Sequence, residues 1–122
     1  MTALSDANLP AIPEIDVHAL TARMQAGDAV VIDVREDEEW DEMHVPGIPL
    51  LPMSEFELDA VPERAGKPLF ILCRSGVRSL AVARRLVHRL GQTDVYNVTG
   101  GILAWHAAGY PVESASPQEA AA

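Results

Sequence analysis

Residues 68–91 read PLFILCRSGVRSLAVARRLVHRLG, and this stretch predicts the fold more clearly than any other part of the chain. The apolar run 68–72 is typical of a strand that is covered on both faces. Residues 74–78 follow as a loop, and residues 79–90 place apolar side chains at helical spacing. The side chains expected to face the core from this helix are Leu80, Ala83, Val87 and Leu90. The stretch therefore predicts a strand, a loop and a helix, with Cys73 directly after the strand.

The rest of the chain alternates between strand-like and helix-like segments. Further strands are expected at residues 12–15, 29–34, 48–51 and 94–98. Segment 48–51 is assigned to a sheet edge, because Pro49 has no N–H to donate. Further helices are expected between the N-cap Asp16 and Gly27, and at 36–43, 54–60 and 102–108. This alternation predicts an α/β fold, a three-layer α/β/α domain with a mainly parallel sheet of about five strands.

The length of 122 residues corresponds to one domain, which we expect over residues 12–113. Residues 1–11 are expected to be a flexible N-terminus and residues 114–122 a flexible C-terminal tail. No apolar run approaches the ~20 residues of a membrane span, and the first residues lack the pattern of a secretory signal. We therefore expect a cytoplasmic protein without a membrane partner.

The charge of the chain is strongly negative and unevenly distributed. With 9 Lys and Arg against 18 Asp and Glu, the net charge is −9. Such a field argues against nucleic acid or an anionic membrane as a partner. Residues 64–89, in contrast, hold seven basic residues and no acidic one. Cys73 lies within this basic segment, so a small anionic substrate remains compatible with the acidic chain.

Cys73 is the only cysteine, so neither an internal disulfide nor a multi-cysteine zinc site can form. In open parallel sheets, reactive groups lie beyond the carboxyl ends of the strands, which is where Cys73 is expected. Loop N–H groups, the start of the following helix and the charges of Arg74 and Arg78 would lower the thiol pKa. The alternative is a small buried hydrophobic cysteine, which would need neither the glycine loop nor the arginines.

Residues 73–79, with the sequence CRSGVRS, resemble the active-site loop of the rhodanese-like family of sulfurtransferases. Other motifs that agree with the family in order and spacing are IDVR at 32–35, HVPG at 44–47, GGILAW at 100–105 and AGYPV at 108–112. The resemblance extends from about residue 12 to residue 112. The chain departs from the family pattern at Met43, where glycine is usual, and at residues 48–49.

The resemblance implies a single α/β domain in which Cys73 takes the outer sulfur of a donor such as thiosulfate. Cys73 then holds this sulfur as a persulfide and passes it to cyanide, a thiol or a protein, without a cofactor. The resemblance assigns binding of the small anionic donor and of the persulfide to the other residues of the loop: Arg74, Ser75, Gly76, Val77, Arg78 and Ser79.

Three further features are interpreted as structural. Asp33 and Arg35 end an expected strand, and we expect a scaffold ion pair that supports the site. His44 has no partner cysteine or histidine at ligand spacing, so a hydrogen-bonded loop histidine is expected and no metal site. The acidic run 36–42 is expected to be a solvated face, with docking of a partner as the alternative.

Several other functions compete with sulfur transfer. A cysteine phosphatase or arsenate reductase would carry Cys-x5-Arg, whereas Arg78 follows Cys73 as Cys-x4-Arg. A regulatory interaction module that kept only the fold would not need the cysteine, and a redox sensor would need a second thiol. Within sulfur transfer, an enzyme that consumes thiosulfate and a persulfide carrier between proteins both remain open.

Overall fold

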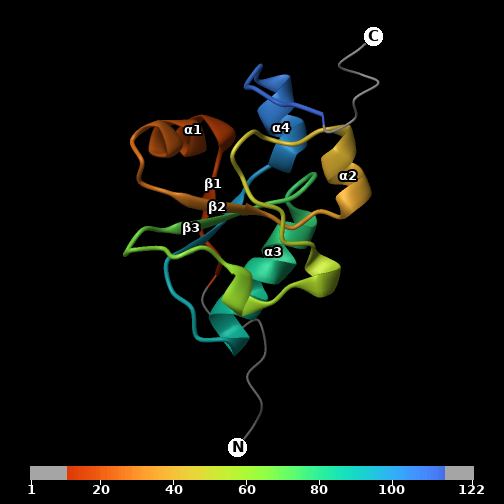
Figure 1. The fold of residues 1–122 in the computed structure, drawn as a ribbon. Coiled ribbons are helices and arrows are strands. Elements are labelled where there is room, and N and C mark those ends of the chain that lie inside the picture. Colours follow the sequence, from red (N-terminus) through yellow and green to blue (C-terminus); the bar gives the residue numbers. More distant parts are fainter. Residues whose placement is uncertain (1–10, 115–122) are drawn as a thin grey trace, which may run out of the picture.

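A computed structural model describes residues 11–114 and contains one parallel sheet (Figure 1). Its strands are β1 (Glu14–Ile15), β2 (Val30–Asp33), β3 (Leu69–Leu72) and β4 (Val95–Val98). Their order across the sheet is β1-β4-β3-β2, and all three pairings are parallel. Strand β3 is therefore central, as a fully apolar sequence requires.

The helices cover both faces of this sheet. They are α1 (Val17–Gln25), α2 (Asp37–Glu42), α3 (Val77–Arg84) and α4 (Gly101–Ala107), and a π-helical turn (Arg85–Arg89) extends α3. Helices α1 and α4 pack on one face of the sheet and α3 on the other (Figure 1). The predicted α/β fold with three layers is confirmed. Asp16 caps α1 as predicted, because its Oδ1 accepts the Ala19 N–H at 2.8 Å.

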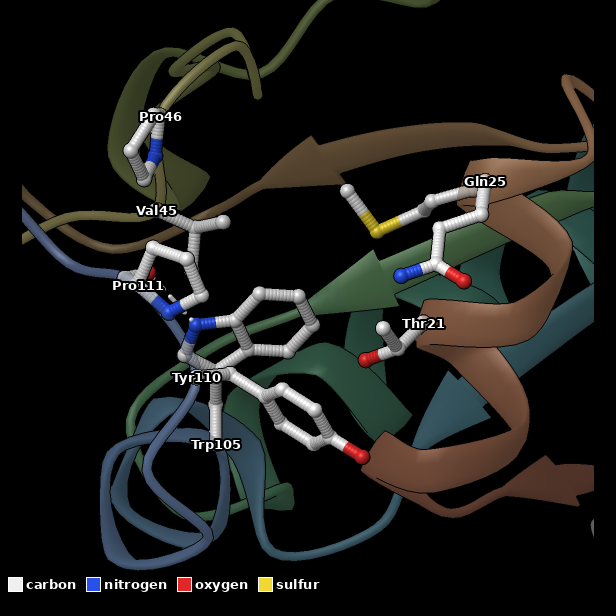
Figure 2. A pocket seen from close by; sticks show the side chains of 8 residues that line it. Thr21, Gln25, Val45, Pro46, Trp105, Tyr110 and Pro111 are labelled. Atoms are coloured by element: carbon white, nitrogen blue, oxygen red, sulfur yellow. Dashed lines mark hydrogen bonds between the residues drawn. The ribbon is translucent and has the colours of Figure 1, made fainter.

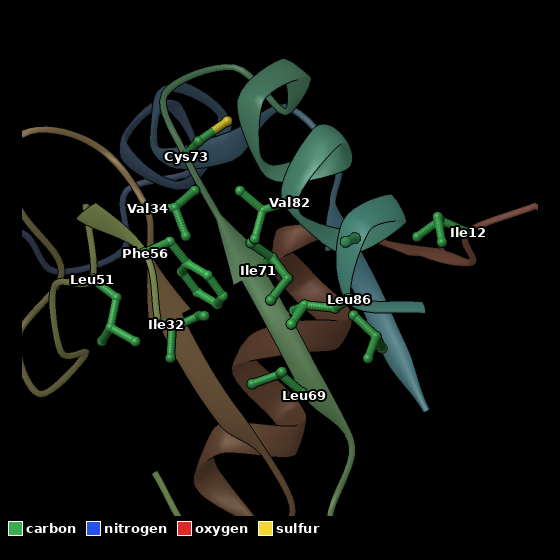
Figure 3. Close-up of a cluster of buried hydrophobic side chains, with 12 residues drawn as sticks. Ile12, Ile32, Val34, Leu51, Phe56, Leu69, Ile71, Cys73, Val82 and Leu86 are labelled. Carbon is green, nitrogen blue, oxygen red and sulfur yellow. The ribbon is translucent and has the colours of Figure 1, made fainter. Parts of the chain in front are cut away.

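The four side chains of β3 alternate between two hydrophobic cores. Leu69 and Ile71 face α3 (Figure 3), whereas Phe70 and Leu72 face α1 and α4. All four are at most 1% exposed. Burial of each such side chain contributes roughly 1.5–3 kcal/mol, so β3 anchors both layers of helices. The segment that follows β3 is thereby held at a defined place.

The expected count of about five strands is wrong by one, because residues 48–51 form only an isolated bridge. Leu50 pairs with Asp33, and the Leu51 N–H donates to the Asp33 carbonyl at 2.8 Å. The preceding rung of this parallel ladder, toward Val31, would need an N–H at Pro49, which proline lacks. The pairing with β2 therefore stops after one bridge.

The helix expected at 54–60 is also wrong. Two 3-10 turns, Met53–Glu55 and Leu58–Ala60, take its place. The backbone of Phe56 and Glu57 is extended between the turns, and the Phe56 ring is buried in the core on the α3 side (Figure 3). Burial of this ring outweighs the weak preference of a short segment for regular helix.

Helix α3 begins at Val77, two residues before the predicted start, and its buried face differs from the expected one. The buried residues of α3 and its π-helical extension are Ser79, Val82, Ala83 and Leu86. Leu80 and Val87 are only partly buried, and Leu90 is 39% exposed. Ser79 occupies an inward position that the apolar pattern did not reveal.

The expected flexible ends, 1–11 and 114–122, lie outside the described residues except for Ala11 and Ser114. Among residues 11–114, no helix has the length and hydrophobicity needed to cross a bilayer.

Candidate active site

Cys73 lies at the carboxyl end of the central strand, as the sequence predicted. Its side chain is 1% exposed and contributes to the core on the α3 side (Figure 3). The loop that follows turns back at Gly76, whose φ of 98° is unfavourable for residues with a Cβ. Gly76 is the N-cap of α3, so this helix begins directly after the turn of the loop.

Backbone N–H groups at the start of helix α4 hold the loop in place. The N–H of Ile102 donates to the Cys73 carbonyl at 2.8 Å, and that of Leu103 to the Arg74 carbonyl at 3.1 Å. This close approach requires glycine at position 101, because a Cβ there would lie 2.4 Å from both carbonyl oxygens. In the sequence, Gly101 stands out only as part of the GGILAW motif, without a predicted role at the site.

Hydrogen bonds to the Cys73 sulfur favour the thiolate. Sγ accepts the Gly76 N–H at 3.1 Å and lies 3.1 Å from Ser79 Oγ. Burial raises the thiol pKa, but hydrogen bonds from the Ser79 hydroxyl and from the N–H groups of Ser79, Gly76 and Ser75 outweigh this effect. The pKa of Cys73 is therefore below its ordinary value, which increases the fraction of reactive thiolate at neutral pH.

Asn97, on β4, holds both the hydroxyl beside the sulfur and the turn of the loop. Its Oδ1 accepts the Ser79 hydroxyl at 2.5 Å, while its Nδ2 donates to the Gly76 carbonyl at 3.0 Å. Nδ2 also donates to Glu14 Oε1 at 3.2 Å, so the network reaches strand β1. Sequence analysis missed Asn97, although an amide within an apolar strand is a signal that could have found it.

The Ser79 hydroxyl has one proton and two acceptors. With Asn97 Oδ1 accepting that proton, a Cys73 thiol donates its own proton to Ser79 Oγ. After ionisation of Cys73, the hydroxyl can instead donate to the thiolate. Ser79 is fully buried, so water does not compete for this bond.

Replacement of Ser79 by alanine is expected to raise the pKa of Cys73, because the variant loses the hydroxyl donor to the thiolate. A hydrogen bond to a charged group contributes about 1.5–3 kcal/mol, so alkylation at neutral pH should slow by roughly tenfold or more. Because Cys73 is the only thiol, ultraviolet absorbance of the thiolate against pH measures its titration directly. Ser75→Ala, which keeps its N–H, is the control. An unchanged titration midpoint in Ser79→Ala would contradict the assigned role of the hydroxyl.

Arg78 is not the free cation that the sequence analysis expected near the sulfur. Its Nη1 and Nη2 donate to Glu39 Oε1 and Oε2 at 2.6 and 2.7 Å. The Arg78 guanidinium lowers the pKa of Glu39 to about 2, and Glu39 in turn raises the pKa of Arg78. The expectation that residues 36–42 are only a solvated face is therefore wrong for Glu39, which contacts the loop.

Other loop residues lie at the surface. The Val77 side chain is 73% exposed, and Arg74 and Ser75 are also exposed. A pocket of about 70 Å³ beside the loop, here called the rim pocket, is lined by Arg35, Glu39, Glu42, Met43, Arg74, Ile102 and Leu103. Within residues 11–114, no hydrogen bond or ion pair holds the Arg74 guanidinium, so its charge is open to a ligand.

The expected ion pair between Asp33 and Arg35 is present and buried. Arg35 Nη2 donates to Asp33 Oδ2 at 2.8 Å, and the two side chains are 3% and 0% exposed. The guanidinium also donates to the carbonyls of Glu39 at 3.3 Å and Met43 at 2.7 Å. Arg35 thereby ties the end of β2 to α2 and places Glu39 opposite the loop.

His44 is a hydrogen-bonded loop histidine, as predicted. Its Nδ1 lies 2.8 Å from the Trp40 carbonyl, and its Nε2 lies 3.1 Å from Glu113 Oε1. The ring also stacks on Trp40, with 3.9 Å between centroids. No group of three or more metal-ligating side chains occurs within the described residues.

A larger apolar pocket, about 310 Å³ in volume, lies between α1, residues 45–46 and the segment after α4 (Figure 2). The rings of Trp105 and Tyr110 form one of its walls. None of its lining residues belongs to the Cys73 loop. We therefore do not assign it to the site.

Comparisons with known proteins agree on one family. The family model for the Rhodanese-like domain matches residues 16–108. The chain is 33% identical over 102 residues to the putative sulfur carrier protein YrkF of Bacillus subtilis, and the match covers 83% of this chain and 55% of YrkF. It is 30% identical over 100 residues to the thiosulfate sulfurtransferase GlpE of Vibrio cholerae, with 82% of this chain and 93% of GlpE covered. The chain thus spans about half the length of the first relative and nearly all of the second.

A solved structure supports the same conclusion. The chain is similar to a rhodanese-related protein of Thermoplasma volcanium, with a TM-score of 0.69 and 31% sequence identity. The similarity covers 83% of this chain and 97% of the Thermoplasma chain.

Proposed function

The chain belongs to the rhodanese-like domain family, and on that basis we propose that it is a sulfurtransferase with Cys73 as the nucleophile. A sulfane sulfur from thiosulfate or a similar donor forms a persulfide on Cys73 and then moves to cyanide, a thiol or a protein acceptor. The observation that carries this proposal is the position of the sole cysteine, which lies at the end of a central strand with hydrogen-bond donors directed at its sulfur.

The proposed cycle begins with attack of the Cys73 thiolate on the outer sulfur of the donor. The sulfur–sulfur bond of the donor breaks, and with thiosulfate the leaving group is sulfite. The terminal sulfur anion of the persulfide is then stabilised by N–H groups of residues 74–79, as preorganised donors stabilise an oxyanion. The geometry supports this assignment, since the Gly76 N–H already lies 3.1 Å from Sγ.

Residues 74–79 are proposed to bind the donor, with unequal contributions. The backbone N–H groups of Ser75, Gly76 and Ser79 stabilise the sulfur, and Arg74 offers an unpaired charge. Asp33 and Arg35 support the site without touching the sulfur. We further propose that residues 12–113 form the complete domain and that it acts in the cytoplasm, where its single thiol stays reduced.

A second candidate function is that of a persulfide carrier between proteins. It is favoured by the similarity to YrkF, which is named as a putative sulfur carrier. Both functions use the same Cys73 persulfide and differ in the acceptor. A phosphatase is disfavoured because Arg78 follows at Cys-x4-Arg and its guanidinium is held by Glu39 rather than directed at a tetrahedral anion.

Incubation of the protein with a sulfane-sulfur donor is expected to add one sulfur atom to the peptide that contains Cys73. Mass spectrometry of intact and digested protein measures this addition, and a reductant should remove it. Release of the added sulfur by cyanide as thiocyanate would identify it as sulfane sulfur. If no donor adds sulfur to Cys73, or if the protein hydrolyses a phosphate ester instead, the proposal is wrong.

A further inference from the structure

Arg78 and Glu39 form a charge pair beside the loop of the proposed nucleophile, and the proposed cycle assigns no step to this pair. We propose that Glu39 selects the sulfur donor by disfavouring dianions such as thiosulfate relative to organic persulfides, R–S–SH. This inference rests on the proposed sulfur transfer at Cys73 and names its substrate class. It makes Glu39 a residue that determines specificity.

The Glu39 carboxylate occupies both ends of the Arg78 guanidinium, where an incoming anion would otherwise bind. The two hydrogen bonds are 2.6 and 2.7 Å long, a bidentate geometry that leaves no Nη atom of Arg78 without an acceptor. Glu39 Oε1 also accepts the Glu36 N–H at 3.2 Å, as part of the capping box of α2. Three donors thus fix the carboxylate in place.

Glu39 remains charged under all ordinary assay conditions. Its pKa of about 2 means that the carboxylate is ionised at any pH above about 4. An anionic donor therefore always meets a fixed negative charge beside the loop. It can recruit Arg78 only by displacing a carboxylate that is already hydrogen-bonded.

The charges around the rim pocket balance. Its basic side chains are Arg35 and Arg74, and its acidic side chains are Glu39 and Glu42. Including the partners Asp33 and Arg78 gives three cations and three carboxylates. Glu42 therefore offsets the charge that Arg74 offers to a dianion, and the net charge of −9 opposes the approach of the dianion.

The exposed surface next to the loop offers apolar contacts instead. Val77, within residues 73–79, is 73% exposed, and Leu103, whose N–H donates to the Arg74 carbonyl, is 42% exposed. These are two of only four large hydrophobic side chains that are exposed among residues 11–114. A carbon-bound donor can cover them, whereas thiosulfate has no apolar part.

The two donor classes differ in the total negative charge of the reacting groups when the Cys73 thiolate attacks. Attack of the Cys73 thiolate on R–S–SH forms Cys73–S–SH, breaks the donor S–S bond and releases R–S⁻ with the bonding electron pair. The reacting groups carry one negative charge, or two if the persulfide is ionised. With thiosulfate, the reacting groups carry three negative charges. The attack then forms Cys73–S–S⁻, breaks the S–S bond of thiosulfate and releases sulfite.

The test measures the rate at which Cys73 gains a sulfur atom, by mass spectrometry of quenched samples. The donors are thiosulfate, 2-mercaptoethanol persulfide and a short peptide with a persulfidated cysteine. Wild type should load faster from the two organic donors than from thiosulfate. In Glu39→Gln, which keeps an oxygen for Arg78 and for the Glu36 N–H, loading from thiosulfate should rise by about tenfold and loading from organic donors by less than twofold.

Glu38→Gln is the matched control, because it removes the same charge from an exposed position of the same helix. It should change loading from thiosulfate by less than twofold. A second measurement needs no variant. If the net negative charge of the protein opposes the approach of dianions, wild-type loading from thiosulfate should accelerate as ionic strength rises, while loading from the organic donors should not.

The outcomes separate this inference from the proposed function. Thiosulfate loading that matches organic donors in wild type, or that Glu39→Gln leaves unchanged, overturns the inference while sulfur transfer at Cys73 stands. Failure of every donor to load Cys73 overturns the proposed function. Faster loading from both organic donors than from thiosulfate supports the inference, and the faster of the two organic donors then identifies whether the donor is a small thiol or a polypeptide.

Discussion

Replacement of Cys73 by alanine is expected to abolish sulfur transfer, with a fall of more than about a thousandfold in turnover with any donor. The chain has no other cysteine, so no second thiol can accept the sulfur. The N–H groups that are proposed to stabilise the persulfide remain in the variant, but no sulfur is left to accept their hydrogen bonds. The measurement is turnover with thiosulfate and with an organic persulfide, each with a thiol acceptor.

Stability provides the control for this variant. Cys73 is buried, but alanine removes only one sulfur atom from the core, so unfolding free energy should fall by about 1 kcal/mol. Thermal unfolding by circular dichroism would show whether the fold persists. A folded Cys73→Ala variant that still transfers sulfur would disprove the assignment of the nucleophile.

Replacement of Gly101 by alanine is expected to disrupt both stability and activity. The new Cβ would lie 2.4 Å from the carbonyl oxygens of Cys73 and Arg74. The φ of 57° adds roughly 1–2 kcal/mol for a residue with a Cβ, and the overlap adds about 1–3 kcal/mol. The free energy of unfolding should therefore fall by about 2–5 kcal/mol, and urea unfolding measures this change.

The same change should displace the loop that holds Cys73, the proposed nucleophile. Relief of the overlap moves α4 away from the Cys73 and Arg74 carbonyls, and misplacement by about 1 Å can cost about a hundredfold in rate. We expect the thiolate titration to shift as well, because the Gly76 N–H moves with the loop.

Gly109→Ala is the matched control for this prediction. Gly109 also has a positive φ, of 84°, but a Cβ there would meet no atom within 4 Å. The free energy of unfolding of this variant should fall only by the cost of a positive φ, roughly 1–2 kcal/mol, and sulfur transfer should be retained. Equal effects of the two substitutions would show that the close approach to the loop is unimportant.

Features that depend on neighbouring residues were predictable. The apolar run 68–72 and the capped segment after Asp16 lie where the sequence analysis expected them, because strand burial and helix capping leave a local pattern. The position of Cys73 after a central strand followed from the same pattern. The phase of α3 did not, because Ser79 faces inward to a partner that lies 18 residues further along the chain.

The failures at residues 48–51 and 54–60 have a related origin. Both segments have short apolar patterns that fit a strand or a helix in isolation. In the folded chain, Pro49 ends the ladder after one bridge, and burial of Phe56 draws the backbone into an extended conformation between two turns. Short segments carry little intrinsic stability, so tertiary contacts decide their conformation.

The sequence by itself determined the α/β fold, the position of Cys73 after the central strand and the loop that follows it, because these depend on residues within one strand–loop–helix unit. Only the tertiary structure decided which charged side chains lie beside the loop of Cys73. Glu39 and Arg78 are 39 residues apart, and Asn97 reaches Gly76 across 21 residues. Pairing over such separations depends on how β2, β4 and α2 pack around β3, and no local periodicity records it.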